Sequence, residues 1–405
     1  MKSLIEPARS VPERAGYDVV VCGGGPAGVA AALASAREGA STVLLENQGC
    51  LAGVWTSGLL SVLLDAEDKP GLMAEIRSQL ERHNALTAQN LYDAEVMKWL
   101  LESLCLQAGV HLHFHTRVVA ARWNNRTVTH VVLESKEGRW AVAGGMFVDT
   151  TGDGDFAALA GCGFDLGRES DGRTQPMSLM ALVDGIPPAA VPPRHPDDVS
   201  FLEPDVFCRW LERAGHSPTY RKPGLFALPN GLFALMANHV YEKSALSSID
   251  LTTATVQARD EIHRCVAALR RIGPEWKAVR LVSTASQIGV REGRRIHGRH
   301  RITRRDVIEG TRHSDAVTRV RFPVDIHSLT KDAGGGFGSL GMVSQPYDIP
   351  MRALQARDRD NLLMAGRCIS GDFYAHASYR VTGNAVATGE AAGQFAAREI
   401  LGRPT

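Results

Sequence analysis

A glycine-rich segment near the start of the chain has the residue types and spacing that bind a phosphate group. It follows an apolar run, Val19 to Cys22, that indicates a buried strand, and it reads Gly23-Gly24-Gly25-Pro26-Ala27-Gly28. Gly23 permits a tight turn, Gly25 lets the backbone approach a pyrophosphate, and Gly28 lets a following helix pack close to the strand. The N-terminus of that helix directs free N–H groups and a positive dipole end at a phosphate.

The residues after this segment complete a unit that can hold a dinucleotide. We expect an alanine-rich helix from Val29 to Glu38, with Gly39 as its C-cap, and a second strand from Ser41 to Leu45. Glu46 follows eighteen residues after Gly28, where a carboxylate accepts hydrogen bonds from a ribose diol. Two other interpretations are a core turn without a ligand and a membrane span over the uncharged residues 19–36. Four glycines and a proline within that run argue against a span.

A histidine pattern farther along the chain has the spacing of a metal site. His111, His113 and His115 alternate within residues 111–118, which predicts a strand with three imidazoles on one face. Such an arrangement can hold zinc. The alternative is a structural strand whose histidines face a helix or solvent. We favour it because no further ligand is apparent nearby, and we assign no metal site.

A second turn, rich in glycine and short acids, runs Asp149-Thr150-Thr151-Gly152-Asp153-Gly154-Asp155. It follows a short apolar strand, Met146 to Val148, so it is either a core turn or a second contact with the same dinucleotide. Its position after a strand of the same sheet favours the second interpretation. Residues 336–341 also match GxGxxG, but no strand precedes them and Pro346 follows soon after. We interpret that segment as a flexible loop.

The composition narrows the class of protein. The chain has 405 residues, with 45 Lys and Arg against 44 Asp and Glu, so the overall charge gives no sign of nucleic-acid or membrane-surface binding. Its seven cysteines form no CxxC pair, which suits reduced thiols in a cytosol, and the N-terminus lacks the apolar stretch of a signal peptide. Seven arginines between Arg291 and Arg305 could form a nucleic-acid patch. Glycines interrupt them and no aromatic platform accompanies them, so we expect solvated or paired side chains, with one or two facing an anionic group.

The rest of the pattern predicts an α/β fold with an insertion. We expect helices over 71–84, 94–108, 250–271 and 303–310, and strands near 118–123, 128–134, 139–142, 176–183 and 225–237. Residues 1–16 suggest a mobile lead-in, and prolines between 187 and 204 predict a surface excursion. A buried strand, Leu362 to Ala365, and a helix from Thr382 to the C-terminus close the chain.

Four of these elements together resemble the FAD-dependent oxidoreductases of the glutathione-reductase-like superfamily. They are the GGGPAG turn with Glu46, the TGDGD turn, the strand into GRCISGD, and the terminal helix. More narrowly, the stretches GRTQPMSLM, FPVDIH and YDIPMRAL are similar to those of the bacterial FAD-dependent oxidoreductase family with an inserted substrate domain. The resemblance implies a Rossmann-like FAD-binding domain, with a parallel sheet and a small antiparallel piece, made of residues 17–165 and 351–405. Residues 166–350 would form an inserted α+β substrate domain.

The resemblance also implies which residues hold FAD. Gly23, Gly25 and Gly28, with Pro26 and Ala27 between them, would hold the pyrophosphate, and Glu46 would hold the adenosine ribose. The backbone of Val118 would meet the adenine, Gly152 and Asp153 would border the adenosine end, and Ala52 and Gly53 would lie along the isoalloxazine. Gly371 and Asp372 would hold the ribityl or pyrophosphate region. The start of the terminal helix would face the flavin N1–C2=O edge, where its positive end favours the anionic reduced flavin, through Thr382, Gly383, Asn384 and Ala385.

The function that this resemblance implies is hydride transfer between a small-molecule substrate and the flavin N5. Two loops would face the ring, Asp325 to His327 and His376 to Arg380. In them His327 or His376 would act as the base, Arg380 would bind an anionic substrate or stabilise reduced flavin, and Tyr379 would complete the catalytic set. The alternatives are a flavin-dependent monooxygenase and a non-catalytic flavin-binding protein. We expect no nucleic-acid or membrane partner and a cytoplasmic location.

Overall fold

The first six strands of the described residues and the last one form a seven-stranded sheet. The computed structural model describes residues 4, 8–187, 191 and 203–404. The strand order is β3-β2-β1-β6-β5-β4, and β17 also pairs with β6. The strands are β1 (Glu13–Cys22), β2 (Thr42–Leu45), β3 (His111–His113), β4 (Arg117–Asn124), β5 (Thr127–Ser135), β6 (Gly138–Asp149) and β17 (Leu362–Met364).

The core of this sheet is parallel. β1 pairs in parallel with β2 and β6, β3 joins β2 in parallel, and β17 joins the C-terminal end of β6 in parallel. β4, β5 and the first half of β6 are antiparallel and form the smaller piece. Residues Val19–Cys22 of β1 are fully buried, as expected for a parallel strand covered on both faces.

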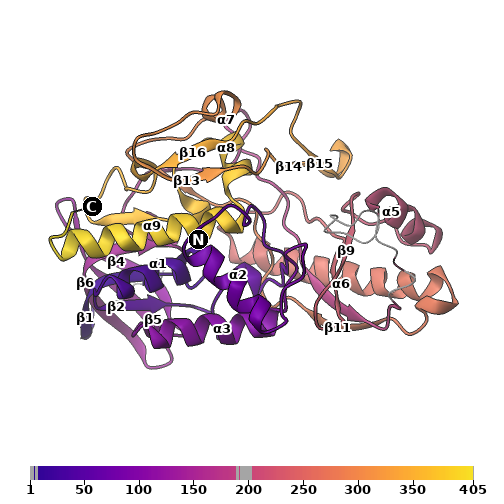
Figure 1. Ribbon diagram of the computed structural model, residues 1–405, viewed down its shortest axis with the longest axis horizontal. Coiled ribbons are helices and arrows are strands. Elements are labelled where there is room, and N and C mark those ends of the chain that lie inside the picture. Colours follow the sequence, from indigo (N-terminus) through magenta and orange to yellow (C-terminus); the bar gives the residue numbers. More distant parts are fainter. Residues whose placement is uncertain (1–3, 5–7, 188–190, 192–202, 405) are drawn as a thin grey trace.

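Two helices rich in small residues lie together against the sheet (Figure 1). They are α1 (Pro26–Arg37), which follows the glycine turn, and α9 (Thr382–Ile400), which ends the chain. A Cβ atom added to Gly389 would lie 2.1 Å from the carbonyl oxygen of Ala27, and one added to Gly393 would lie 2.2 Å from that of Ala31. The two backbones therefore meet without side chains between them. Helices α2 (Leu72–Arg82) and α3 (Ala94–Gln107) pack nearby.

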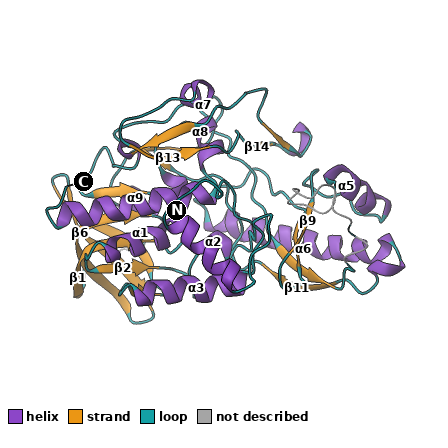
Figure 2. Cartoon of the chain, viewed as in Figure 1, coloured by secondary structure: helices purple, strands orange, loops and turns teal. Residues whose placement is uncertain are grey.

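A second, antiparallel sheet lies at the other end of the molecule from the C-terminus (Figure 1). Its order is β11-β8-β10-β9, and the long helix α6 (Ser248–Ile272) packs against β11 and against α5 (Pro204–Arg213), as Figure 2 shows in purple and orange. The strands are β8 (Ala181–Asp184), β9 (Gly224–Ala227), β10 (Phe233–Met236) and β11 (Arg280–Thr284).

Three short pairs of strands belong to neither of the two large sheets. They are β7 (Phe164–Asp165) with β12 (Arg295–Ile296), β13 (Ala316–Val320) with β16 (Tyr347–Pro350), and β14 (Ile326–His327) with β15 (Phe337–Gly338). The remaining helices are α4 (Asp155–Leu159), α7 (Arg304–Glu309) and α8 (Phe373–Tyr379), with 3₁₀ turns at Gly53–Trp55, Pro274–Trp276, Lys331–Ala333, Met351–Ala353 and Gly366–Cys368.

The predicted mixed α/β fold, with its parallel Rossmann-like core and additional antiparallel sheets, is confirmed. The division of the chain at residues 165 and 350 stays a prediction. The predicted surface excursion falls largely on residues outside the described ranges. Within those ranges, no helix is long and apolar enough to cross a membrane.

Several local predictions were wrong. The histidine strand ends at His113, because His115 has a φ of 52° and turns the chain before β4 begins at Arg117. The strands expected near 139–142 and 146–148 are one strand, β6. The expected lead-in is ordered from Glu13, where β1 begins, and the loop at 336–341 contains β15. Within the described residues, no group of three or more His, Cys, Asp or Glu side chains has the arrangement of a metal site.

Candidate active site

A single large cavity of about 1450 Å³ extends from the glycine turn to the second sheet. At one end its wall is formed by Gly23, Gly25 and Glu46, at the start of α1 and the end of β2. At the other end the wall includes Arg291, His327 and Arg380. The cavity thus joins the residues expected at a dinucleotide with those expected at a substrate.

The glycines of the first turn have separate physical roles. Gly23 has a φ of 105°, and a Cβ there would lie 2.6 Å from the carbonyl oxygen of Thr150. At Gly28 a Cβ would lie 1.8 Å from the carbonyl oxygen of Gly23, so only glycine allows α1 to start this close to the turn. At Gly25 the nearest atom to such a Cβ is Thr150 O at 4.0 Å, and Gly25 lines the cavity. The backbone at Gly25 therefore leaves room for a pyrophosphate beside the N-terminus of α1, which has no side-chain cap.

Glu46 is held rigidly at the same end of the cavity. Its side chain is 8% exposed and accepts hydrogen bonds from the backbone N–H groups of Gly24 and Gln48, both at 2.6 Å. Burial raises the pKa of this carboxyl, while the backbone hydrogen bonds act in the opposite direction. Each carboxylate oxygen has a further lone pair, so the group can accept from a ribose hydroxyl.

The other residues expected at the adenosine end also line the cavity. They are Val118, Gly152 and Asp153, and Gly53 lines it beside the glycine turn. Asp153 pairs with Arg367 at 2.8 Å, which joins the second turn to the 3₁₀ turn at Gly366–Cys368. Ala52 is fully buried and does not line the cavity, but its backbone N–H donates to Gly24 O at 2.7 Å. Its contribution is to hold the first turn in place.

The N-terminus of α9 reaches the cavity through part of the expected segment. Thr382 and Ala385 line it, whereas Gly383 packs against a loop, where its Cβ would lie 2.1 Å from Asp65 O. Asn384 is buried, and among the described residues its amide atoms and the Thr382 hydroxyl have no hydrogen-bond partner. Buried polar atoms of this kind are uncommon. They fit a polar ligand group, such as the edge of a flavin, at this helix N-terminus.

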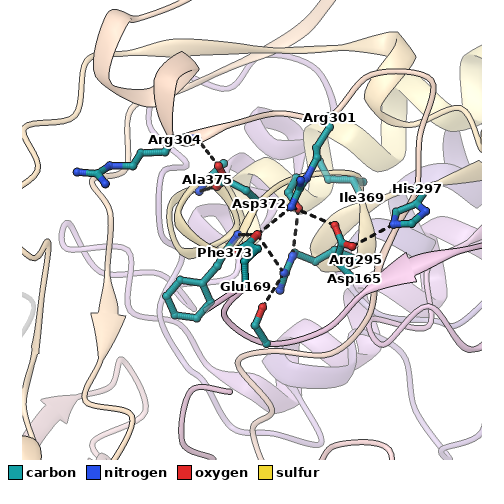
Figure 3. A network of polar contacts seen from close by, with 12 residues as sticks. Asp165, Glu169, Arg295, His297, Arg301, Arg304, Ile369, Asp372, Phe373 and Ala375 are labelled. Carbon is teal, nitrogen blue, oxygen red and sulfur yellow. Dashed lines mark hydrogen bonds and ion pairs between the residues drawn. The ribbon is translucent and has the colours of Figure 1, made fainter. Parts of the chain in front are cut away.

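Four further residues expected at the cofactor or substrate also lie outside the cavity wall: Gly371, Asp372, His376 and Tyr379. His376 and Tyr379 belong to the expected loop from His376 to Arg380, but most of that segment lies in helix α8. Asp372 is its N-cap, accepting from Ala375 N at 2.8 Å and from Arg304 N at 2.5 Å. Figure 3 shows Asp372 beside an ion network of Asp165, Glu169, Arg295, His297 and Arg301. These residues join β7 and β12 to α8.

The helix also turns His376 and Tyr379 into the protein core. Tyr379 is buried and donates to Ile369 O at 2.9 Å. His376 is fully buried, and its pKa lies well below the usual range because of burial and the nearby charge of Arg295. These two positions are therefore corrected from catalytic to structural, since neither side chain reaches the cavity.

Apart from Arg291, most arginines of the segment from Arg291 to Arg305 are paired, as predicted. Arg294 pairs with Asp155, Arg295 with Glu292, Arg301 with Asp165 and Glu169, and Arg305 with Glu309. Arg291 and Arg294 both line the cavity, but among the described residues Arg291 forms no ion pair.

Asp325, His327 and Arg380 meet at the far end of the cavity, as the sequence predicted. Arg380 donates to Asp325 Oδ2 at 3.0 Å, and His327 Nε2 lies 3.2 Å from the same oxygen. Gln175 Oε1 accepts from the backbone N–H of His327 at 3.0 Å. The backbone and side chains around His327 therefore hold its ring in one orientation.

Three further residues of this cluster, His239, Tyr241 and Tyr220, were not predicted from the sequence. His327 Nδ1 lies 3.1 Å from His239 Nε2, and His239 Nδ1 lies 3.2 Å from the hydroxyl of Tyr241. Tyr220 stacks on His239 with ring centroids 4.2 Å apart. His239 follows β10, with no motif around it, so its meeting with His327 depends on tertiary folding alone.

The electrostatics of the cluster keep both histidines neutral. Burial, followed by the charge of Arg291, lowers the pKa of His327 to about 3, although Asp325 acts in the opposite direction. Burial lowers the pKa of His239 still further. Burial would raise the pKa of Asp325, but the hydrogen bond from His327 and the charge of Arg380 outweigh it and hold that pKa well below its usual range. A carboxylate at Asp325 then requires the His327 proton on Nε2, and His239 donates from Nε2 to His327 Nδ1.

This fold and site define a Rossmann-type oxidoreductase with a dinucleotide cofactor. Residues 18–403 match the model of the FAD dependent oxidoreductase family, and the chain belongs to that family. It is an enzyme, and its cofactor is FAD.

Solved flavoprotein structures share the fold. The aromatic hydroxylase CabE from angucycline biosynthesis matches with a TM-score of 0.51 at 14% identity, over 96% of this chain and 63% of that one. OxyS anhydrotetracycline hydroxylase from Streptomyces rimosus has a TM-score of 0.50 at 14% identity, with the same coverage. The myxobacterial chondrochloren halogenase CndH has a TM-score of 0.51 at 12% identity, over 97% of this chain and 77% of that one. This chain thus spans 63% of the length of the two hydroxylases. No curated protein matches the chain.

Proposed function

We propose that this enzyme transfers a hydride between a small-molecule substrate and the N5 atom of FAD, with Asp325, His327 and His239 handling the accompanying proton. The observation that carries the proposal is the continuity of one cavity from the α1 N-terminus to the Asp325–His327–Arg380 cluster. A cofactor held at the first end would have its reactive part toward the second, and the α9 N-terminus, which would face that part, also lines the cavity. When bound, FAD supplies the redox chemistry by accepting or giving two electrons with a hydrogen.

The residues expected to hold FAD are those that line the first part of the cavity. Gly25 and the N-terminus of α1 would bind the pyrophosphate, and Glu46 would bind the adenosine ribose. The N-terminus of α9, at Thr382 and Ala385, would face the flavin ring and favour negative charge there. As part of this proposal, we assign the enzyme to the glutathione-reductase-like superfamily of flavoproteins, which it resembles in sequence.

The cluster at the far end is built to move a proton. Its hydrogen bonds run in one direction, from His239 Nε2 to His327 Nδ1 and from His327 Nε2 to Asp325 Oδ2. Asp325 and His327 line the cavity, and a proton that the substrate loses would be taken up at Asp325 Oδ1, which accepts no hydrogen bond among the described residues, while His327 and His239 hold the carboxylate. Arg380 holds Asp325 in position through two contacts of 3.0 Å, to the carboxylate and to the backbone oxygen.

The test is anaerobic reduction of the bound flavin in a stopped-flow instrument, for wild type and His327→Gln. We expect His327→Gln to keep its FAD and to be reduced about a hundredfold more slowly, the usual loss for a positioned acid or base. His263→Gln is the matched control, because His263 is exposed on α6, and it should react as wild type does. Equal rates for wild type and His327→Gln would remove His327 from the mechanism. Product hydroxylated only in the presence of oxygen would replace hydride transfer by monooxygenation.

A further inference from the structure

Arg291 lines the cavity near Arg380 and, unlike Arg380, Arg367 and Arg294 on the same wall, has no carboxylate partner among the described residues. Arg380 pairs with Asp325 at 3.0 Å, Arg367 with Asp153 at 2.8 Å, and Arg294 with Asp155 at 2.8 Å. Among the described residues, Arg291 forms no ion pair. Its side chain is partly buried, and a charge withdrawn from water is costly unless it is paired, so this position favours an anion from outside the chain.

The hydrogen bonds of Arg291 leave one edge of its guanidinium free toward a ligand. Nη1 donates to Pro176 O at 2.7 Å and to Ser178 Oγ at 2.9 Å. These two acceptors use both hydrogens of Nη1. The Nε and Nη2 hydrogens have no protein partner among the described residues, and they point in parallel along one edge. That edge matches the two oxygens of a carboxylate.

The charge of Arg291 persists at neutral pH. Burial and the neighbouring charge of Arg380 lower its pKa to about 10, which still leaves the group protonated. Apolar side chains line the same part of the cavity, among them Met180, Phe226, Met236 and Phe337. A ligand that fills this region therefore has a mainly apolar body and one negatively charged end.

We infer that the substrate is a carboxylic acid whose carboxylate binds the Nε and Nη2 edge of Arg291. Its apolar body would pack against the apolar side chains with which the second sheet lines the cavity. This inference rests on the proposed function for its choice of cavity. It replaces Arg380, the expected anion-binding residue, because Arg380 is occupied by Asp325.

Binding at Arg291 also acts on the proposed base. The positive charge of Arg291 is one of the causes that lower the pKa of His327. The same charge lowers the pKa of Asp325, so a carboxylate bound to Arg291 offsets it and makes Asp325 a stronger base when the substrate is present. The substrate's charged end would thus prepare the group that receives its proton.

The test measures binding to the FAD-loaded enzyme by calorimetry, without turnover. The ligands are benzoate, octanoate and succinate, each compared with its own amide, which keeps the shape and removes the charge. We expect at least one acid to bind about tenfold or more tightly than its amide. In Arg291→Gln that preference should fall by about 10- to 100-fold, the range for hydrogen bonds to a charged group.

The control variant is Arg305→Gln, which removes the same charge from the same segment at an 80% exposed side chain. It should bind the acids as wild type does. Arg291→Lys keeps the charge but not the bidentate edge, so it should lie between wild type and Arg291→Gln, and it decides the matter if Arg291→Gln does not fold. The inference is overturned if no acid binds better than its amide, or if both Arg291 variants bind the acids as wild type does. Acid binding that depends on Arg291 without any flavin reduction would instead overturn the proposed hydride transfer and leave the site standing.

Discussion

Gly25 and Gly28 lie three residues apart in one turn, yet substitution should affect them in opposite ways. Gly25 has φ −67° and ψ −176°, an extended conformation that any residue adopts, and its side-chain direction opens into the cavity. Gly25→Val should therefore fold but fill the space for the pyrophosphate. Gly28→Ala should not keep the native turn, because its Cβ would meet a backbone oxygen at 1.8 Å.

The magnitudes follow from these contacts. An ordinary Cβ contact begins at 3.4 Å, so in Gly28→Ala the helix and turn must separate by 1.6 Å, the difference from 1.8 Å. Overpacking of this kind costs about 1–3 kcal/mol or more. A chain of 405 residues loses roughly 1 °C in Tm for each kcal/mol. For Gly25→Val, the loss of two hydrogen bonds to a charged phosphate costs about 3–6 kcal/mol in FAD binding, at least a hundredfold in Kd.

The assay is the FAD released on denaturation, per mole of protein, together with Tm before and after FAD is added. Gly25→Val should be colourless and folded, with a Tm that does not rise when FAD is added. Gly28→Ala should show a lowered Tm even in the absence of FAD. If Gly25→Val retained stoichiometric FAD with wild-type affinity, the assignment of the pyrophosphate to this turn would be wrong.

Three further predictions concern the role of Arg380 in flavin reduction, the dependence of stability on pH, and the structural role of Asp372. The Arg380→Ala variant should lose flavin reduction by an amount similar to His327→Gln while keeping FAD, because it releases Asp325 from the position that orients His327; stopped-flow rates with FAD content measured in parallel check this. His327 has a pKa of about 3 in the folded chain against about 6.5 when unfolded, so the unfolded state binds the extra proton and stability should fall as pH decreases from about 6.5 toward 3, by up to ~1.4 kcal/mol per pH unit for this one group. Denaturant unfolding of His327→Gln should show a shallower dependence over that window, and an unchanged slope would contradict the burial of a neutral imidazole there. Asp372→Ala should cost about 1 kcal/mol of stability, because helix α8 loses its N-cap, and should leave the FAD content unchanged. Loss of FAD in this variant would contradict the placement of Asp372 outside the cofactor site.

The cofactor end of the site was predictable because its chemistry is local in sequence. The turn, helix and acid from Gly23 to Glu46 occupy one continuous segment, and their geometry follows from glycine sterics and strand order. Val118, Gly152 and Asp153 were placed at the cavity by the resemblance, since they follow strands of the same sheet.

The substrate end was only partly predictable because it depends on contacts far apart in the chain. His239 and His327 are separated by 88 positions and meet only after the second sheet packs beside β14. The segment from His376 to Arg380 was expected as a loop over the ring, but the Asp372 cap starts helix α8, which extends to Tyr379. That helix removed His376 and Tyr379 from the cavity. In the sequence Arg291 is one of seven arginines in its segment. It differs from its neighbours because they form ion pairs, and those pairs depend on the tertiary structure.

The most direct test of the account is an oxygen-free screen of the FAD-loaded enzyme against metabolite fractions separated by charge, with flavin absorbance as the signal. The account predicts that a fraction of apolar carboxylic acids bleaches the flavin without oxygen, and that His327→Gln slows this bleaching about a hundredfold. Reduction confined to neutral or cationic fractions, or no reduction of a flavin that dithionite reduces readily, would contradict it.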